Sequence, residues 1–152
     1  MTHGMEGWNL SIRTTLLPKD TNQHGTIFGG VILSYIDFAC AIEAKRFCEQ
    51  EVVTVAMKEI EFKEPVFVGD LISFYTRIIH TGRTSMTIEV HVMTFHDQNK
   101  PKGRDGSMVT EAQATFVAID KDRRPEPIRI RESKYDPPAF SPEYLRERLK
   151  FK

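Results

Sequence analysis

The sequence predicts an α+β fold in which one long central helix is wrapped by a curved antiparallel sheet of about five to six strands. Residues 30–49 contain a broad apolar surface and no proline or glycine after Gly30, which is typical of a long helix buried on most sides. Several other segments are rich in Val, Ile and Thr or alternate apolar and polar residues, as strands do. One buried helix with about five strands favours an antiparallel sheet packed round that helix.

The expected elements follow one another in a simple order. A first strand, expected at an edge of the sheet, covers residues 10–17 and stops at Pro18. Residues 19–30 form a loop rich in turn-forming residues and lead into the helix. Further strands are expected at residues 52–62, 71–80, 85–96 and 109–119.

The composition fits one domain with no general affinity for charged polymers. The 152 residues include 21 Lys plus Arg and 21 Asp plus Glu, so the formal net charge is zero. A balanced chain lacks the basic footprint of a protein that binds nucleic acid or an anionic membrane. Its apolar runs are too short to span a bilayer, and residues 1–8 lack the pattern of a signal peptide. We therefore expect a cytoplasmic protein without nucleic-acid or membrane partners.

The two cysteines, Cys40 and Cys48, do not indicate a disulfide or a metal site. Eight positions along one helix separate them by about 12 Å, which is too far for a disulfide between them. The sequence has no CxxC motif and no Cys/His cluster with the spacing of zinc ligands. We expect neither a metal nor a redox cofactor.

The chain is expected to contain a single domain with short extensions. Residues 1–9 form an N-terminal arm, residues 10–121 the domain, and residues 122–152 a charged, proline-rich tail. Within the tail, Ser141 followed by Pro142 has the pattern of a helix N-cap and first turn. We therefore expect a short helix there, either solvated or packed on a neighbouring subunit.

The loop at residues 20–30 and the start of the helix carry the pattern that is most informative about chemistry. Gly25, Gly29 and Gly30 allow a ligand to approach the backbone closely. The first turn of a helix has N–H groups without intrahelical partners and a partial positive charge. This combination predicts a place where an oxyanion or an anionic ligand is stabilised.

Asp37 stands in the middle of the otherwise apolar helix. An interior carboxylate costs several kcal/mol unless it is paired, so its position needs a reason. It is either a general base or nucleophile in a cleft, or a carboxylate that faces solvent or caps a neighbouring chain. The residues by themselves favour neither interpretation.

The spacing between Gly29 and Asp37 predicts a dimer if both residues serve one substrate. Eight positions along a helix correspond to about 12 Å. Groups that act on one carbonyl must each come within about 3 Å of the reacting atoms. Two antiparallel helices across a two-fold axis meet this requirement, with Gly29 of one subunit facing Asp37 of the other.

Four motifs, at residues 20–37, 52–55, 62–70 and 81–85, resemble the YciA-like acyl-CoA thioesterases, the family that includes the brain-type acyl-CoA hydrolases. The motifs fall in the order expected for that family, and the resemblance covers roughly residues 10–119. It implies the hotdog fold and homodimers that often assemble as trimers of dimers. It also implies hydrolysis of acyl-CoA to a free acid and CoA, so that CoA is part of the substrate and no cofactor is required.

The resemblance assigns catalytic roles residue by residue. It implies that Asp37 activates water or attacks the thioester, and that the Gly29 N–H polarises the thioester carbonyl. It also implies that Asn22 from the opposite subunit positions the water or the thioester, and that Thr54 places a hydroxyl near the water. Phe28 departs from the histidine that several hotdog relatives have at this position.

The resemblance further implies that Arg83, Thr84 and Ser85 form a turn near the phosphates and pantetheine of CoA. Arginine suits phosphate because its planar guanidinium forms paired hydrogen bonds. Two other candidates are weaker. His24 lies in the glycine-containing loop but has no visible partner, and Cys40 is expected to be a small buried residue rather than a nucleophile.

Other functions stay open at the level of the sequence. The site could hydrolyse aromatic acyl-CoA or acyl-carrier-protein thioesters, or the protein could be a non-catalytic acyl-CoA-binding or sensing module. A structural oligomer that does not bind CoA is a third alternative. The presence of Asn22, Gly29 and Asp37 together favours an enzyme, because binding does not require a carboxylate near a thioester.

Overall fold

The computed structural model describes residues 6–95 and 107–132 of the chain. Its elements are β1 (Asn9–Thr15), the short 3-10 helix η1 (Pro18–Asp20), α1 (Gly29–Phe47), β2 (Glu51–Phe62), β3 (Leu71–Thr81), β4 (Ser85–Phe95) and β5 (Met108–Ile119). The predicted α+β class and the predicted order of elements are confirmed. The short helix expected at Ser141 lies outside the described residues.

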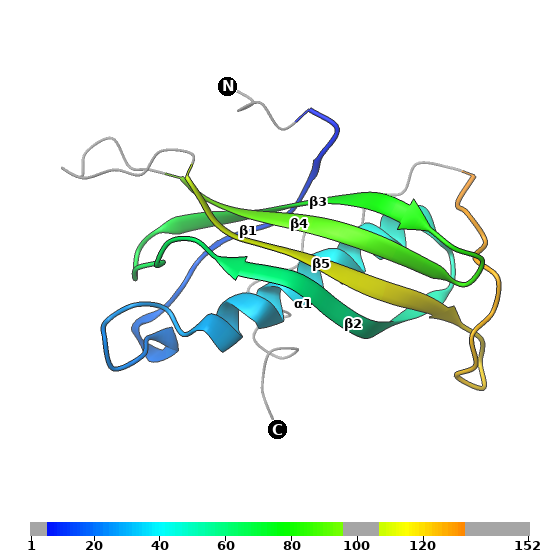
Figure 1. The fold of residues 1–152 in the computed structure, drawn as a ribbon, viewed down its shortest axis with the longest axis horizontal. Helices are drawn as coiled ribbons and strands as arrows, with labels where there is room; N and C mark the ends of the chain where they lie inside the picture. Colours follow the sequence, from blue (N-terminus) through cyan, green and yellow to red (C-terminus); the bar gives the residue numbers. More distant parts are fainter. Residues whose placement is uncertain (1–5, 96–106, 133–152) are drawn as a thin grey trace.

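The strands form one antiparallel sheet in the order β1-β3-β4-β5-β2. The helix α1 crosses one face of this sheet, and the strands curve around it (Figure 1). The first strand lies at an edge, as predicted. The strand that follows the helix, β2, lies at the opposite edge, where it pairs with β5 on one side.

The core lies between α1 and the concave face of the sheet. Ile36, Ala39 and Cys40 have no exposed surface and pack on the sheet. Their partners on the strands include the fully or almost fully buried Ile72, Phe74, Ile88, Val90, Ala114 and Phe116. The expectation that the helix is buried on most sides is met in part. Seven of its nineteen residues are buried and the others are partly buried, because the sheet covers one side and leaves Val31, Leu33 and other apolar residues partly exposed.

A buried carboxylate fixes the helix to the first edge of the sheet. Both oxygens of Glu43 accept hydrogen bonds from Asn9 Nδ2, over 3.0 and 3.1 Å. Glu43 Oε2 also accepts from Arg46 Nη1 over 2.7 Å and from Thr76 Oγ1 over 3.0 Å. Because a buried charge is tolerated when it is paired and hydrogen-bonded, these contacts join α1 to β1 and β3.

Candidate active site

The loop before α1 is organised by the side chain of Asn22. Its Oδ1 accepts hydrogen bonds from the backbone N–H of His24 over 2.8 Å and of Thr26 over 3.2 Å. Its Nδ2 donates to Thr26 Oγ1 over 2.8 Å. Asparagine commonly bonds to its own backbone in this way and so stabilises a turn. In the single chain the Asn22 side chain therefore holds its own loop, a structural role that the sequence did not reveal.

Two backbone hydrogen bonds direct this loop into the helix. Phe28 N donates to Asp20 O over 2.8 Å, and Ile27 N donates to Val66 O over 2.8 Å. Phe28 occupies the N-cap position and forms no side-chain capping hydrogen bond. Within residues 6–95 and 107–132, no acceptor bonds to the N–H of Gly29 or Gly30. The start of α1 therefore offers unused donors and a partial positive charge to a ligand oxygen.

The two glycines at this helix start are in different surroundings. A Cβ atom on Gly30 would lie 2.8 Å from Cε1 of the Phe28 ring, so that ring would have to move. A Cβ atom on Gly29 would lie 3.4 Å from Cζ of Phe62, which is ordinary van der Waals contact. The aromatic rings of Phe28 and Phe62 therefore border the donors at the start of α1.

The helix carboxylate has a partner on the neighbouring strand. Thr54 Oγ1 of β2 donates a hydrogen bond to Asp37 Oδ1 over 2.6 Å. The register of β2 against β5 shifts between Thr54 and Ala56, and such irregularities re-aim side chains next to functional sites. Asp37 is half-buried, so its carboxylate remains accessible while one of its oxygens is held. The structure thus brings together two of the four residues predicted to be catalytic.

Gly29 and Asp37 do not meet within one chain. Both lie on α1, which runs without a break from Gly29 to Phe47. Their separation of eight residues again corresponds to about 12 Å along the axis. A single subunit therefore cannot present both groups to one carbonyl.

The edge strand β2 exposes several apolar side chains between charged ones. On β2, Val55 is 56% exposed and Phe62 is 51% exposed, and Ile60 of the same strand is also exposed. Phe28, at the helix start, is 58% exposed. A long apolar edge strand with unpaired backbone groups is a site for pairing with another strand.

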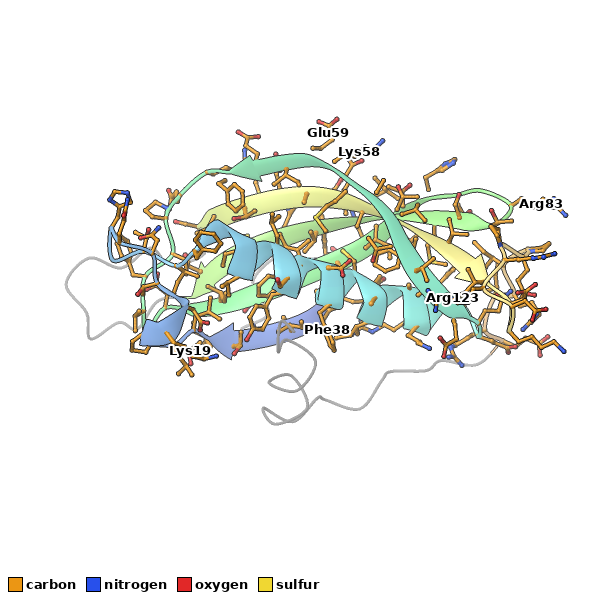
Figure 2. All side chains as sticks on the ribbon, turned by 90° about the horizontal axis from the view of Figure 1, so that it is seen from below. Lys19, Phe38, Lys58, Glu59, Arg83 and Arg123 are labelled. Atoms are coloured by element: carbon orange, nitrogen blue, oxygen red, sulfur yellow. The ribbon has the colours of Figure 1, made fainter. Side chains whose placement is uncertain are left out.

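The turn predicted to bind CoA lies at the other end of the molecule. Gly82 N donates to Ser85 O over 2.8 Å, and this hydrogen bond closes the turn that contains Arg83 and Thr84. Arg83 lies at the end of the sheet opposite to Lys19, whose turn precedes α1 (Figure 2). The structure therefore does not bring Arg83, Thr84 and Ser85 together with Gly29 of the same chain.

The segment after β5 packs back beside this turn. Ile128 N donates to Arg83 O over 3.0 Å, and Arg131 N donates to Phe47 O over 2.9 Å, so the segment reaches the end of α1. The buried Gln50 holds it as well, because its Nε2 donates to Pro127 O over 2.7 Å and its Oε1 accepts from Arg129 N over 2.7 Å. Sequence reasoning missed this contact, since nothing in the charged, proline-rich segment indicates where it packs.

This segment lines a groove that was not predicted. The groove has a volume of about 810 Å³, and its lining contains three cationic and three acidic side chains: Lys121, Arg123, Arg129, Glu51, Asp120 and Glu126. Arg123 lies at the same end of the molecule as Arg83 (Figure 2). Arg129 forms an ion pair with Glu126 over 3.2 Å, and the acidic and cationic side chains of the groove balance in number, so the groove has no excess of positive charge.

Two weaker candidates from the sequence, Cys40 and His24, remain. Cys40 is fully buried, and desolvation together with Asp37 and Glu43 raises the pKa of its thiol, which disfavours the nucleophilic thiolate. His24 is exposed. Among the described residues, no group of three or more His, Cys, Asp or Glu side chains could hold a metal ion, and no α-helix is long and apolar enough to cross a membrane.

A long helix cradled by a curved antiparallel sheet, with free donors at the helix start and a carboxylate two turns later, defines a protein of the hotdog-fold thioesterase class. The family model of the Thioesterase superfamily matches residues 24–99. The chain belongs to this family, within which it is similar to the YciA acyl-CoA thioester hydrolases.

Known relatives cover most of the chain. It is 38% identical to the acyl-CoA thioester hydrolase YciA of Salmonella typhimurium, over 80% of this chain and 90% of the relative. It is 36% identical to the Escherichia coli protein of the same name, over 85% of this chain and 97% of the relative.

Solved structures of thioesterases have folds similar to that of this chain. A hexameric hotdog-fold thioesterase of Campylobacter jejuni superposes with a TM-score of 0.73 at 39% identity, over 79% of this chain and 90% of that one. A hexameric thioesterase of Yersinia pestis also has a TM-score of 0.73, at 38% identity, over 80% of this chain and 96% of that one. The predicted hotdog fold is therefore confirmed.

Proposed function

We propose that this protein hydrolyses acyl-CoA thioesters to a free carboxylic acid and CoA. The observation that carries this proposal is the hydrogen bond from Thr54 to Asp37 in a chain whose relatives are acyl-CoA thioester hydrolases. Thr54 holds one oxygen of the Asp37 carboxylate, and this carboxylate lies beside the edge strand β2, which requires a partner strand. This arrangement fits catalysis better than simple binding. The free donors at Gly29 provide the second part of the site.

The proposed site is shared by two subunits. Pairing of the apolar β2 edges across a two-fold axis would bury Val55 and Phe62 of both chains and would place the helices antiparallel. The start of one α1 then lies near the partner's Asp37. The hexameric state of the relatives from Campylobacter jejuni and Yersinia pestis supports a trimer of such dimers.

In the proposed reaction the Gly29 N–H donates a hydrogen bond to the thioester carbonyl oxygen and stabilises the negative charge that develops there. Along one route, the partner's Asp37 takes a proton from water, the water oxygen adds to the carbonyl carbon, and the C–S bond breaks. Along the other, Asp37 itself attacks, CoA leaves as the thiolate, and water hydrolyses the resulting anhydride. In either case the thiolate takes up a proton, and Thr54 keeps the carboxylate oriented.

The antiparallel dimer also gives the CoA turn a role. The end of one subunit that carries Arg83 would lie beside the start of the partner's α1. Arg83, Thr84 and Ser85 would then bind CoA from the subunit opposite to Gly29, with Asn22 stabilising the loop at the reacting end.

The test is steady-state hydrolysis of short-, medium- and long-chain acyl-CoA, with CoA release followed by chromatography. Asp37→Asn should lower turnover by at least about 100-fold, the scale of general-base loss, while the protein keeps its fold and assembly. Near-normal turnover of Asp37→Asn would remove Asp37 from this role. CoA binding without hydrolysis by the wild type would instead favour a sensing module. Hydrolysis confined to aromatic or carrier-protein thioesters would identify a different thioesterase.

A further inference from the structure

A cavity of about 290 Å³ opens beside Gly29, on the inner side of the sheet. Its lining combines apolar and polar residues. The apolar ones are Ile27, Ile32, Phe62, Pro65 and Val66, and the polar ones are Lys63, Glu64 and Thr110. The free N–H of Gly29 is at the same place as this cavity. A group attached to a carbonyl held by Gly29 would therefore enter this cavity.

Thr110 of β5 is the buried polar residue of this lining, whereas Lys63 and Glu64 are exposed. It is 1% exposed, and within the described part of the chain its Oγ1 has no hydrogen-bond partner. Strand alternation places Thr110 on the same face as Ala112 and Ala114, which is the face that packs on α1. An unpaired buried hydroxyl destabilises a folded protein, so its presence here requires an explanation.

The hydroxyl groups of the other buried threonines of the sheet form hydrogen bonds. Thr76 Oγ1 donates to Glu43 over 3.0 Å and lies 2.6 Å from Ser11 Oγ. Thr94 Oγ1 donates to Ser107 O over 3.3 Å. Thr110 is the buried threonine that lines the cavity, and a valine of nearly the same shape would fill its position without an unpaired oxygen.

We infer that the cavity at the start of α1 binds the acyl group and that the Thr110 hydroxyl selects short acyl groups that carry a hydroxyl or carbonyl oxygen. This inference rests on the proposed thioesterase function, because the carbonyl held by Gly29 is what directs the acyl group into the cavity. The volume of 290 Å³ is about twice that of a 150 Å³ apolar cavity that accepts benzene, and so suits a short chain. Rotation about χ1 of Thr110 exchanges the hydroxyl and the methyl group, so the hydroxyl can face an oxygen of the substrate.

Specificity kinetics test the inference directly. The substrates are butyryl-CoA and its 2-, 3- and 4-hydroxy derivatives, and the readout is kcat/KM for each. At least one hydroxybutyryl-CoA should exceed butyryl-CoA by about 5- to 10-fold in the wild type, the scale of one neutral hydrogen bond. Thr110→Val should abolish this advantage, measured as the ratio of kcat/KM for hydroxybutyryl-CoA to kcat/KM for butyryl-CoA, whereas Thr110→Ser should retain it.

The matched control is Thr115→Val, the same substitution on the opposite face of β5. It should leave the ratio of hydroxybutyryl-CoA to butyryl-CoA unchanged. Thr110→Val should also raise the midpoint of thermal unfolding relative to the wild type, because it removes an unpaired buried oxygen. Thr115→Val should not raise it.

The outcomes separate this inference from the proposed function. If the wild type hydrolyses butyryl-CoA but Thr110→Val leaves the hydroxyl preference unchanged, the inference is wrong and the thioesterase proposal stands. A wild type that prefers butyryl-CoA over all three hydroxy derivatives also overturns the inference. A wild type that hydrolyses no acyl-CoA overturns both.

Discussion

Thr54 and Asp37 are joined by a hydrogen bond of 2.6 Å between Oγ1 and Oδ1, although 17 residues separate them in the sequence. The bond links the helix α1 to the edge strand β2 at the place where the register of that strand shifts. It fixes one carboxylate oxygen and leaves the second for chemistry. The orientation of the proposed catalytic carboxylate therefore depends on a residue from a different element.

This relationship predicts the effect of removing the Thr54 hydroxyl. Thr54→Val should lower kcat by between about 10- and 100-fold, less than the 10²–10⁴ expected from loss of a general base, because the carboxylate remains but loses its orientation. Thr54→Ser keeps the donor and should retain most of the turnover. Steady-state kinetics on one acyl-CoA measures both variants. Equal activity of Thr54→Val and the wild type would show that the hydrogen bond has no role in catalysis.

The exposed edge of β2 predicts the route of assembly. Val55→Lys places a charge in the apolar edge that the proposed dimer buries, so it should dissociate the assembly and abolish turnover. Light scattering coupled to size-exclusion chromatography measures the mass. Ile79→Lys, at another exposed aliphatic residue in a strand, is the matched control and should leave the mass unchanged. An intact assembly in Val55→Lys would place the subunit interface elsewhere.

The surroundings of His91 predict how the free energy of unfolding depends on pH. Its ring lies 4.3 Å from that of Trp8, and Glu89, Glu111, Arg77 and Lys63 surround it. Burial lowers the pKa of His91 despite the opposing effect of Glu89 and Glu111. The unfolded chain therefore binds a proton at His91 more readily than the folded chain does. The contribution of neutral His91 to the free energy of unfolding is full above the unfolded pKa of about 6.5, and it is lost as pH falls through the folded pKa.

Unfolding by urea at several pH values between about 7.5 and 5 tests this dependence. The free energy of unfolding should fall with decreasing pH more steeply in the wild type than in His91→Gln. The comparison uses the slope with pH, because His91→Gln also loses the contact with Trp8 at every pH. Identical slopes in the two proteins would mean that His91 titrates alike in the folded and unfolded states.

Most of the fold could be predicted because its signals are local. The apolar run without glycine or proline predicted α1, and the alternation at residues 85–96 predicted β4. The predicted ends differ from the observed Gly29–Phe47 and Ser85–Phe95 by two residues or fewer. The surroundings of Glu43 could not be predicted in this way. Its partners Asn9 and Thr76 lie 34 and 33 residues away, so its burial depends on the tertiary arrangement of β1 and β3.

The candidate site was predictable to a smaller extent. A carboxylate in an apolar helix and glycines at the helix start are visible in the sequence, whereas the pairing of Asp37 with Thr54 depends on the strand register. Asn22 was predicted from resemblance to act on water or the thioester, and the structure adds hydrogen bonds to its own loop. The unpaired hydroxyl of Thr110 and the packing of residues 128–131 beside Arg83 follow from long-range contacts that no local pattern encodes.

The central claim is that one active site uses Gly29 from one subunit and Asp37 from the other, and subunit mixing tests it most directly. Gly29→Val should inactivate one variant, because a branched side chain presses on Phe62 and blocks the approach to the N–H, and Asp37→Asn should inactivate the other. If the two inactive chains are co-expressed in equal amounts, half of the dimers are mixed and each mixed dimer has one intact site. The mixture should therefore recover about a quarter of wild-type acyl-CoA hydrolysis. A mixture as inactive as its two parents, with mixed dimers demonstrated by mass spectrometry, would contradict the shared site.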